Sequence, residues 1–179
     1  QADSYLQGQI TVNINKLTEN TARHFAHCDN KGKTWSTGYV TRHQNKLLLV
    51  TNEDAGSHSL AQLNKYGVFS KVDILDDTQT YSAYFISLDA VKTNEVKAAL
   101  NQLFSENDVE RLLESDTPDN GSLEKVESEH GVAYFANTSC KGIIVLLDDN
   151  GAKQINSLIE AQTLSCYPQT VFDAIQIQS

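Results

Sequence analysis

The sequence predicts an α+β fold, in which antiparallel sheets carry helices packed against them. Pairs of strand-like segments followed by one helix recur about three times along the 179 residues. No helix separates every strand from the next, as a doubly wound parallel sheet would require. The expected architecture is antiparallel sheets with packed helices, arranged as ferredoxin-like units.

In the first half, turn residues and helical spacing locate the elements. Gly32 closes the turn after Cys28 and supplies the positive φ of a tight reversal. Leu60, Leu63 and Tyr66 recur at helical spacing. Residues 5–17 mix helical and extended signals and stay open. The predicted elements are strands over 22–28, 33–42, 47–50, 72–75 and 81–88, and a helix over 54–66.

The second half repeats the pattern, and we expect the first unit to cover residues 1–88 and the second 89–179. A continuous apolar run over 143–147 predicts a buried strand. Asp149 and Asn150 follow it as expected caps of a helix. The remaining predicted elements are strands over 123–127 and 132–135, a helix with the stripe Val96, Leu100, Leu103 and Phe104, and a short helix beginning near 107.

The composition excludes some classes of function. The formal net charge is −9, which argues against a general nucleic-acid binder but not against a local pocket for an anion. No apolar run is long enough for a transmembrane helix, and no signal pattern opens the chain. Cys28, Cys140 and Cys166 are far apart and form no C-x-x-C pair. Reduced thiols and a cytoplasmic location are expected.

The histidines and cysteines predict neither a metal site nor a catalytic residue. The chain has five histidines, and none pairs with another at metal-binding spacing with a carboxylate partner. His24 and His27 are three apart and fall on opposite faces of the predicted strand. Cys28 follows His27 directly, so their side chains point apart and form no thiolate–imidazole pair.

Three sequence blocks together resemble the N-terminal part of the YgfZ family. They are Y-L-Q-G-Q-I-T at Tyr5–Thr11, H-C-D-N-K-G-K-T-W-S at His27–Ser36 and K-Y-G-V-F-S-K-V at Lys65–Val72. Members of that family are folate-binding proteins related to the glycine-cleavage T-protein and linked to maintenance of iron–sulfur enzymes. The resemblance implies a T-protein-like, aminomethyltransferase-like fold around a pocket for tetrahydrofolate or a derivative. The family's K-G-C-Y-x-G-Q-E motif does not occur in these 179 residues.

The resemblance also implies a set of folate ligands. Glutamines flanking Gly8 would contact the pterin edge, and lysines would lie over the glutamate tail. Two positions depart from the family pattern, since Asn13 replaces the usual Asp of T-x-D and Phe172 replaces a tryptophan of some members. Alternatives without a ligand stay open: the glutamines are solvated, the lysines at 31 and 33 belong to an ordinary hairpin loop, and the other lysines only complement a helix dipole. The candidate ligands are Gln7, Gln9, Asn13, Lys31, Lys33, Tyr66, Lys71 and Phe172.

By this resemblance the expected function is that of a cytoplasmic folate-binding accessory protein. Its partners would be folate and iron–sulfur or tRNA-modifying enzymes, without metal, membrane or direct nucleic-acid binding. One alternative is a folate-dependent aminomethyltransferase, against which Asn13 counts because an amide lacks the carboxylate's charge. The other is a non-catalytic protein-interaction domain, which an exposed apolar patch would favour.

Overall fold

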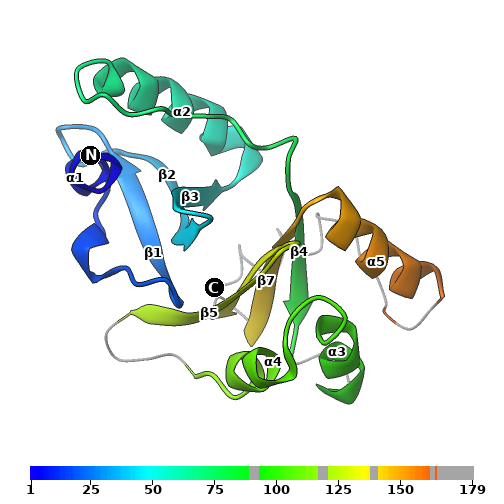
Figure 1. Ribbon diagram of the computed structural model, residues 1–179. Coiled ribbons are helices and arrows are strands. Elements are labelled where there is room, and N and C mark those ends of the chain that lie inside the picture. Colours follow the sequence, from blue (N-terminus) through cyan, green and yellow to red (C-terminus); the bar gives the residue numbers. More distant parts are fainter. Residues whose placement is uncertain (89–92, 117–120, 138–140, 162–163, 165–179) are drawn as a thin grey trace. The chain divides into compact units, whose positions relative to one another are not determined.

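The computed structural model describes residues 1–88, 93–116, 121–137, 141–161 and 164. It contains two compact units: Gln1–Asp77 forms the body of the first, and the second begins at Thr78 (Figure 1). Each combines an antiparallel sheet with helices, so the predicted α+β class is confirmed. The predicted division into family-type units over 1–88 and 89–179 stays a prediction.

The sheet of the first unit has the strand order β3-β2-β1, with both pairs antiparallel. The β1–β2 turn contains Gly32 at φ 82°, as the predicted tight reversal requires, and the β2–β3 turn contains Gln44 and Asn45 at φ 49° and 63°. Gly38 allows β2 and β3 to approach, because a Cβ there would lie 1.9 Å from the carbonyl oxygen of Val50. The strands are β1 (Thr21–Cys28), β2 (Thr34–His43) and β3 (Lys46–Thr51).

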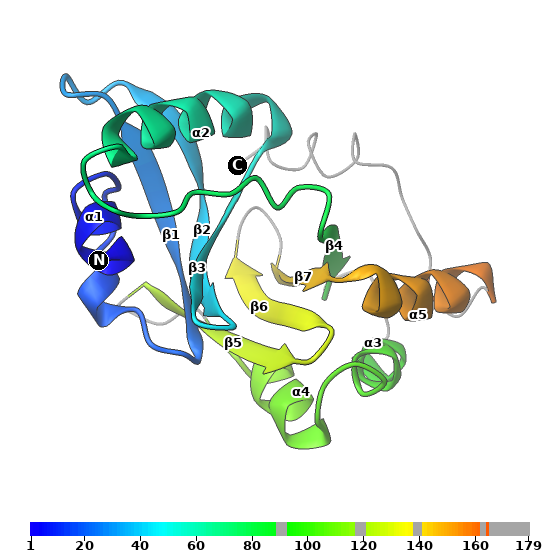
Figure 2. The same ribbon diagram turned by 45° about the horizontal axis from the view of Figure 1, so that its top comes forward.

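Two α-helices and one short 3-10 helix complete the first unit. Helix α2 (Glu53–Gly67) packs against β2, and the chain reverses direction after it (Figure 2). The region left open in the sequence contains α1 (Ala2–Gln7) and the 3-10 helix η1 (Ile14–Lys16). Arg42 of β2 donates two hydrogen bonds to the Asp3 carboxylate, at 3.2 and 2.8 Å, and so fastens α1 to the sheet.

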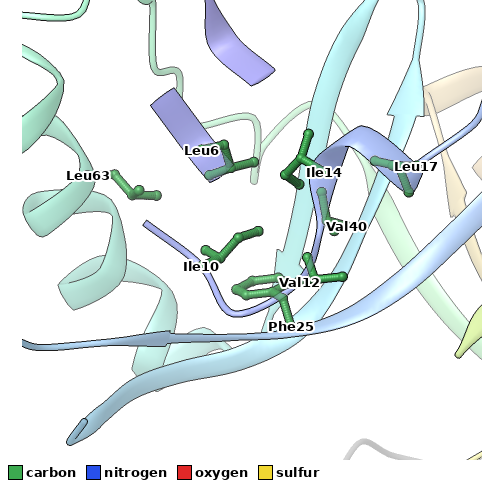
Figure 3. Close-up of a cluster of buried hydrophobic side chains, with 8 residues drawn as sticks. All are labelled: Leu6, Ile10, Val12, Ile14, Leu17, Phe25, Val40 and Leu63. Atoms are coloured by element: carbon green, nitrogen blue, oxygen red, sulfur yellow. The ribbon is translucent and has the colours of Figure 1, made fainter. Parts of the chain in front are cut away.

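The core of the first unit is a cluster of eight buried apolar side chains from α1, η1, the sheet and α2 (Figure 3). Each is at most 8% exposed. Removing this apolar area from water is the main stabilising contribution of the unit. We call this set the buried cluster; it consists of Leu6, Ile10, Val12, Ile14, Leu17, Phe25, Val40 and Leu63.

The second unit has the strand order β5-β6-β7-β4, again antiparallel throughout. Its buried side chains include Leu100 and Leu112 from two helices and Tyr134 from the sheet. Ser105 caps one helix by accepting a hydrogen bond from the backbone N–H of Asp108. The elements are β4 (Ser82–Ser87), α3 (Thr93–Leu100), α4 (Glu106–Leu113), β5 (Ser122–Ser128), β6 (Gly131–Asn137), β7 (Lys141–Leu147) and α5 (Asp149–Glu160).

Three local predictions were wrong. Val72–Leu75 forms no strand; it has neither helix nor strand structure, although Ile74 packs on the buried cluster. Helix α3 ends at Leu100, and Leu103 is buried from a turn beyond it. The cap of α5 is Asp148, one residue earlier than expected, whose carboxylate accepts from the Gly151 N–H at 2.8 Å. Within the described residues, no helix has the length and apolar character needed to cross a membrane.

Candidate functional site

An open hollow of about 500 Å³ lies in the surface of the first unit. Helix α1 and the residues that follow it form one side, and the turn after α2 forms the other. Its lining combines two aromatic rings, amides, hydroxyls and one lysine, and contains no carboxylate side chain. Such a lining suits a flat polar ligand with a negative group. The lining residues are Gln1, Ser4, Tyr5, Gly8, Gln9, Phe69, Ser70 and Lys71.

Tyr5 gives the hollow a fixed wall. Its ring packs against the buried cluster, and its hydroxyl donates a hydrogen bond of 2.6 Å to the carbonyl oxygen of Leu63 on α2. Burial raises the pKa of Tyr5 above its ordinary value, so the hydroxyl remains a donor at neutral pH. The C-cap Gly8 turns the chain at the end of α1, and half-buried Gln9 follows with its N–H bonded to Leu6.

The opposite wall comes from Phe69, Ser70 and Lys71, the last three residues of a stretch that we call the 66–71 segment. Val68 is 73% exposed and Phe69 92% exposed, an unusual position for large apolar side chains. The Ser70 N–H donates to the Gly67 carbonyl at 2.8 Å and closes the turn. Lys71 then adopts φ 48°, a left-handed conformation that is costly for a residue with a Cβ.

The start of this segment places a cation beside an aromatic ring. The Lys65 ammonium lies 5.3 Å from the centroid of the Tyr66 ring, within the range of a cation–π interaction. Tyr66 is 47% exposed. Aromatic surface and positive charge therefore occur together at the C-terminal end of α2.

The hollow brings together two of the eight candidate ligands, Gln9 and Lys71. Gln7 does not line it, because its Oε1 accepts a hydrogen bond of 2.8 Å from the Ile14 N–H and joins α1 to η1. The Asn13 side chain likewise serves the fold, accepting from the Asn15 N–H at 3.0 Å as the cap of η1. An N-cap of this kind is the usual use of asparagine before a short helix.

The other candidate ligands lie elsewhere. The exposed Lys31 and Lys33 belong to the β1–β2 hairpin loop, where both backbone N–H groups donate to the Asp29 carboxylate at 2.8 Å. Tyr66 precedes the turn and does not line the hollow. Phe172 lies outside the described residues. For all eight residues, a role in binding folate stays a prediction.

Phe69 and Tyr5 are the two aromatic residues of the hollow, and neither was among the candidate ligands predicted from the sequence. A signal for Phe69 was present, because Val68-Phe69 stands between two lysines immediately after the helical stripe ends. Tyr5 carries no such signal. It is separated from Leu63 by 58 positions, and only the packing of α1 against α2 brings the two together.

A second polar cluster is buried between β1, β2 and α2. His27 is 1% exposed, and its Nδ1 lies 2.7 Å from the Ser59 hydroxyl oxygen, which also accepts from Ser36 at 3.0 Å. The His27 Nε2 has no hydrogen-bond partner in the described part of the chain. The Trp35 ring packs edge-on against His27 at 4.7 Å and against His58 at 5.7 Å between centroids.

This cluster keeps His27 neutral. Burial lowers the pKa of His27, and the nearby His58 lowers it further. Ser59 is only 3% exposed, so a substrate cannot reach its hydroxyl and we assign it no nucleophilic role. Among the residues described, no group of three or more His, Cys, Asp or Glu side chains could hold a metal ion.

The second unit has a smaller hollow of about 250 Å³ next to the cap of α5. Two aspartates line it, and Asp148 is already committed to the helix N-terminus. The backbone hydrogen bond from Gly151 lowers the pKa of Asp148. This hollow offers no aromatic face and no cation. The hollow of the first unit is therefore the better candidate site.

Comparison with known proteins gives one consistent result. No family model matches the chain. A curated protein named tRNA-modifying protein YgfZ, from Enterobacter sp. (strain 638), is 37% identical over 105 residues, which are 59% of this chain and 30% of the relative. Proteins of the same name from Shigella boydii serotype 18 and Escherichia coli (strain SE11) are 36% identical over the same shares. The match spans less than a third of each relative's length.

Proposed function

The chain is related to the YgfZ family, and from this relationship we propose that it acts in a folate-binding accessory protein that supports tRNA modification. The observation that carries the proposal is the identity of 36–37% over 105 residues to proteins named for that activity. The proposed location is the cytoplasm. The proposed partners are the tRNA-modifying and iron–sulfur enzymes that the family resemblance implies.

The hollow beside α1 is the proposed contribution of this chain to the folate site. Its residues fit such a ligand: Tyr5 and Phe69 offer aromatic faces, the Gln9 amide can pair with a ring edge, and Lys71 can meet a carboxylate. A bound reduced folate would bring a one-carbon carrier to the protein. The residues of this chain would bind and orient it.

Calorimetry with 5-formyltetrahydrofolate tests the binding proposal. Lys71→Gln and Gln9→Ala should each weaken binding by about tenfold, as loss of one charge-assisted or buried hydrogen bond would. Lys16→Gln is the matched control, since Lys16 is an exposed lysine of the same unit that does not line the hollow. Absence of heat at millimolar ligand would reject the folate site. Equal losses in all three variants would reject this location.

The cellular role needs a separate measurement. Cells that lack the gene should contain less of one or more modified tRNA nucleosides by mass spectrometry, and the gene should restore them. Unchanged nucleosides would contradict the accessory role. A folate-dependent one-carbon transfer assay distinguishes the aminomethyltransferase alternative, because only an enzyme would turn over.

A further inference from the structure

We propose that the 66–71 segment is a stacking platform for an unpaired nucleotide of an RNA strand. The proposal rests on the proposed function in tRNA modification and adds a direct contact with RNA. It departs from the expectation drawn from the net charge. That expectation concerned the protein as a whole, whereas the proposal concerns one surface whose local charge is different.

Exposed aromatic surface is the first argument. The four large apolar side chains that stand exposed in the described structure all fall within ten residues, Tyr66, Val68, Phe69 and Leu75. Phe69 presents nearly all of its side chain to solvent at 92% exposure, and Tyr66, three positions earlier in the chain, is 47% exposed. A nucleobase can stack on such a ring whatever its sequence, because every base has a π-face.

The local charge is the second argument. The chain carries 23 acidic residues in 179, yet none lies between Ala55 and Val72. That stretch holds Lys65 and Lys71, one on each side of Phe69 along the chain. Lys65 lies 5.3 Å from the Tyr66 ring centroid. The nearest acid that follows in sequence, Asp73, is two positions beyond Lys71. This surface is complementary to an anion that carries an aromatic ring.

The shape of the surface selects a single strand over a duplex. The bases of a duplex are stacked on each other, and their faces are not available to a protruding phenylalanine. The hollow beside Phe69, about 500 Å³ in volume, leaves room for a base that has turned out of a strand. Lys71, which lines the hollow with Phe69, and Lys65, which lies against the Tyr66 ring, can then meet the neighbouring phosphates. A purely apolar partner protein would provide no negative group to pair with the two lysine charges.

Fluorescence anisotropy with a labelled twelve-nucleotide single strand of mixed U and A tests the proposal on the full chain. Phe69→Leu should weaken binding by about tenfold, as expected for loss of one stacked base. Lys65→Gln with Lys71→Gln should weaken binding and reduce the salt slope by about 1.4, or 0.7 for each phosphate contact. The matched controls are Leu75→Ala, an exposed aliphatic residue of the same region, and Lys16→Gln with Lys46→Gln, two exposed lysines elsewhere in the unit.

Three outcomes would overturn the proposal: no anisotropy change at 0.05 M salt with protein at about 1 mM, equal binding by wild type and Phe69→Leu, or equal binding of a duplex of the same sequence. The melting temperature of each variant, read by circular dichroism, confirms that it is folded. The calorimetric folate titration measures a different ligand on a surface that shares Phe69 and Lys71 with the platform. Folate binding without RNA binding rejects only the platform, whereas RNA binding without an effect on tRNA nucleosides rejects the proposed function.

Discussion

The buried cluster and the 66–71 segment are both apolar, and both use helix α2, yet they have opposite relations to solvent. Leu63 is 8% exposed within the cluster, whereas Tyr66, three residues later on the same predicted stripe, is 47% exposed. Helical spacing therefore shows which face of α2 is apolar. It does not show at which residue that face stops being buried. The sheet and α1 cover the helix as far as Leu63, where the Tyr5 hydroxyl closes the contact.

The largest predicted effect is the difference in stability between two alanine variants, one in each region. Phe25→Ala removes a ring that is 1% exposed in the buried cluster, and we expect a loss of about 3–5 kcal/mol in the free energy of unfolding. Phe69→Ala removes a ring of the same size from the surface and should change it by less than about 0.5 kcal/mol. Urea denaturation followed by circular dichroism measures both. Comparable losses would mean that the 66–71 segment is packed in solution.

Acidification should lower the free energy of unfolding through protonation of the buried His27. Because its pKa is lowered in the folded state, the unfolded chain binds the proton more tightly. The free energy of unfolding should therefore fall as the pH drops below about 6.5, by at most about 1.4 kcal/mol per pH unit for this one proton. His27→Asn, which can keep the contact to Ser59, should flatten the profile between pH 7 and 5. An unchanged slope in that variant would assign the titration to another group.

The salt bridge that holds α1 over the cluster should have a smaller effect. Asp3→Asn breaks the paired hydrogen bonds from Arg42 and should cost about 1 kcal/mol or less, because the Asp3 side chain is 46% exposed. The hydrogen bond from Arg42 lowers the pKa of Asp3, so its contribution is present above the ordinary pKa near 3.8 and is lost as pH falls below it. Wild type and variant should thus differ in urea stability at pH 7 and converge near pH 2.

The smallest predicted effect is a gain in stability from a substitution in the exposed 66–71 segment. Lys71→Gly should raise the free energy of unfolding by up to about 1 kcal/mol, because glycine adopts φ 48° without the steric cost of a Cβ. Lys71→Ala keeps the Cβ and serves as the control for loss of the lysine. A gain in both variants would mean that charge, rather than backbone strain, limits stability there.

Local patterns predicted the elements of the fold that local chemistry determines. Backbone freedom at Gly32 predicted the turn and the strands β1 and β2 on either side of it. Helical periodicity predicted α2. The resemblance to the YgfZ family, predicted from three sequence blocks, is confirmed by the similarity of 105 residues to curated proteins named tRNA-modifying protein YgfZ. The apolar pattern of Val72–Leu75 suggested a strand, but Ile74 is instead used to cover the buried cluster without pairing.

The candidate site was less predictable because it depends on contacts between distant segments. Gln9 and Lys71 line one hollow only because α1 lies beside the turn that follows α2. Gln7 and Asn13 carry the same amide chemistry as Gln9, but their side chains bond to the backbone of Ile14 and Asn15. Sequence shows that an amide is available and cannot show which backbone group already occupies it.

The position of Trp35 gives this protein an internal optical reporter. It is the one tryptophan among the 179 residues, and its ring lies 4.7 Å from that of His27, which is buried, and 5.7 Å from that of His58, which is exposed. A protonated imidazole quenches indole emission. The intrinsic fluorescence of the unlabelled chain should therefore report the protonation of His27, which occurs below the ordinary histidine range because burial lowers the pKa of this ring.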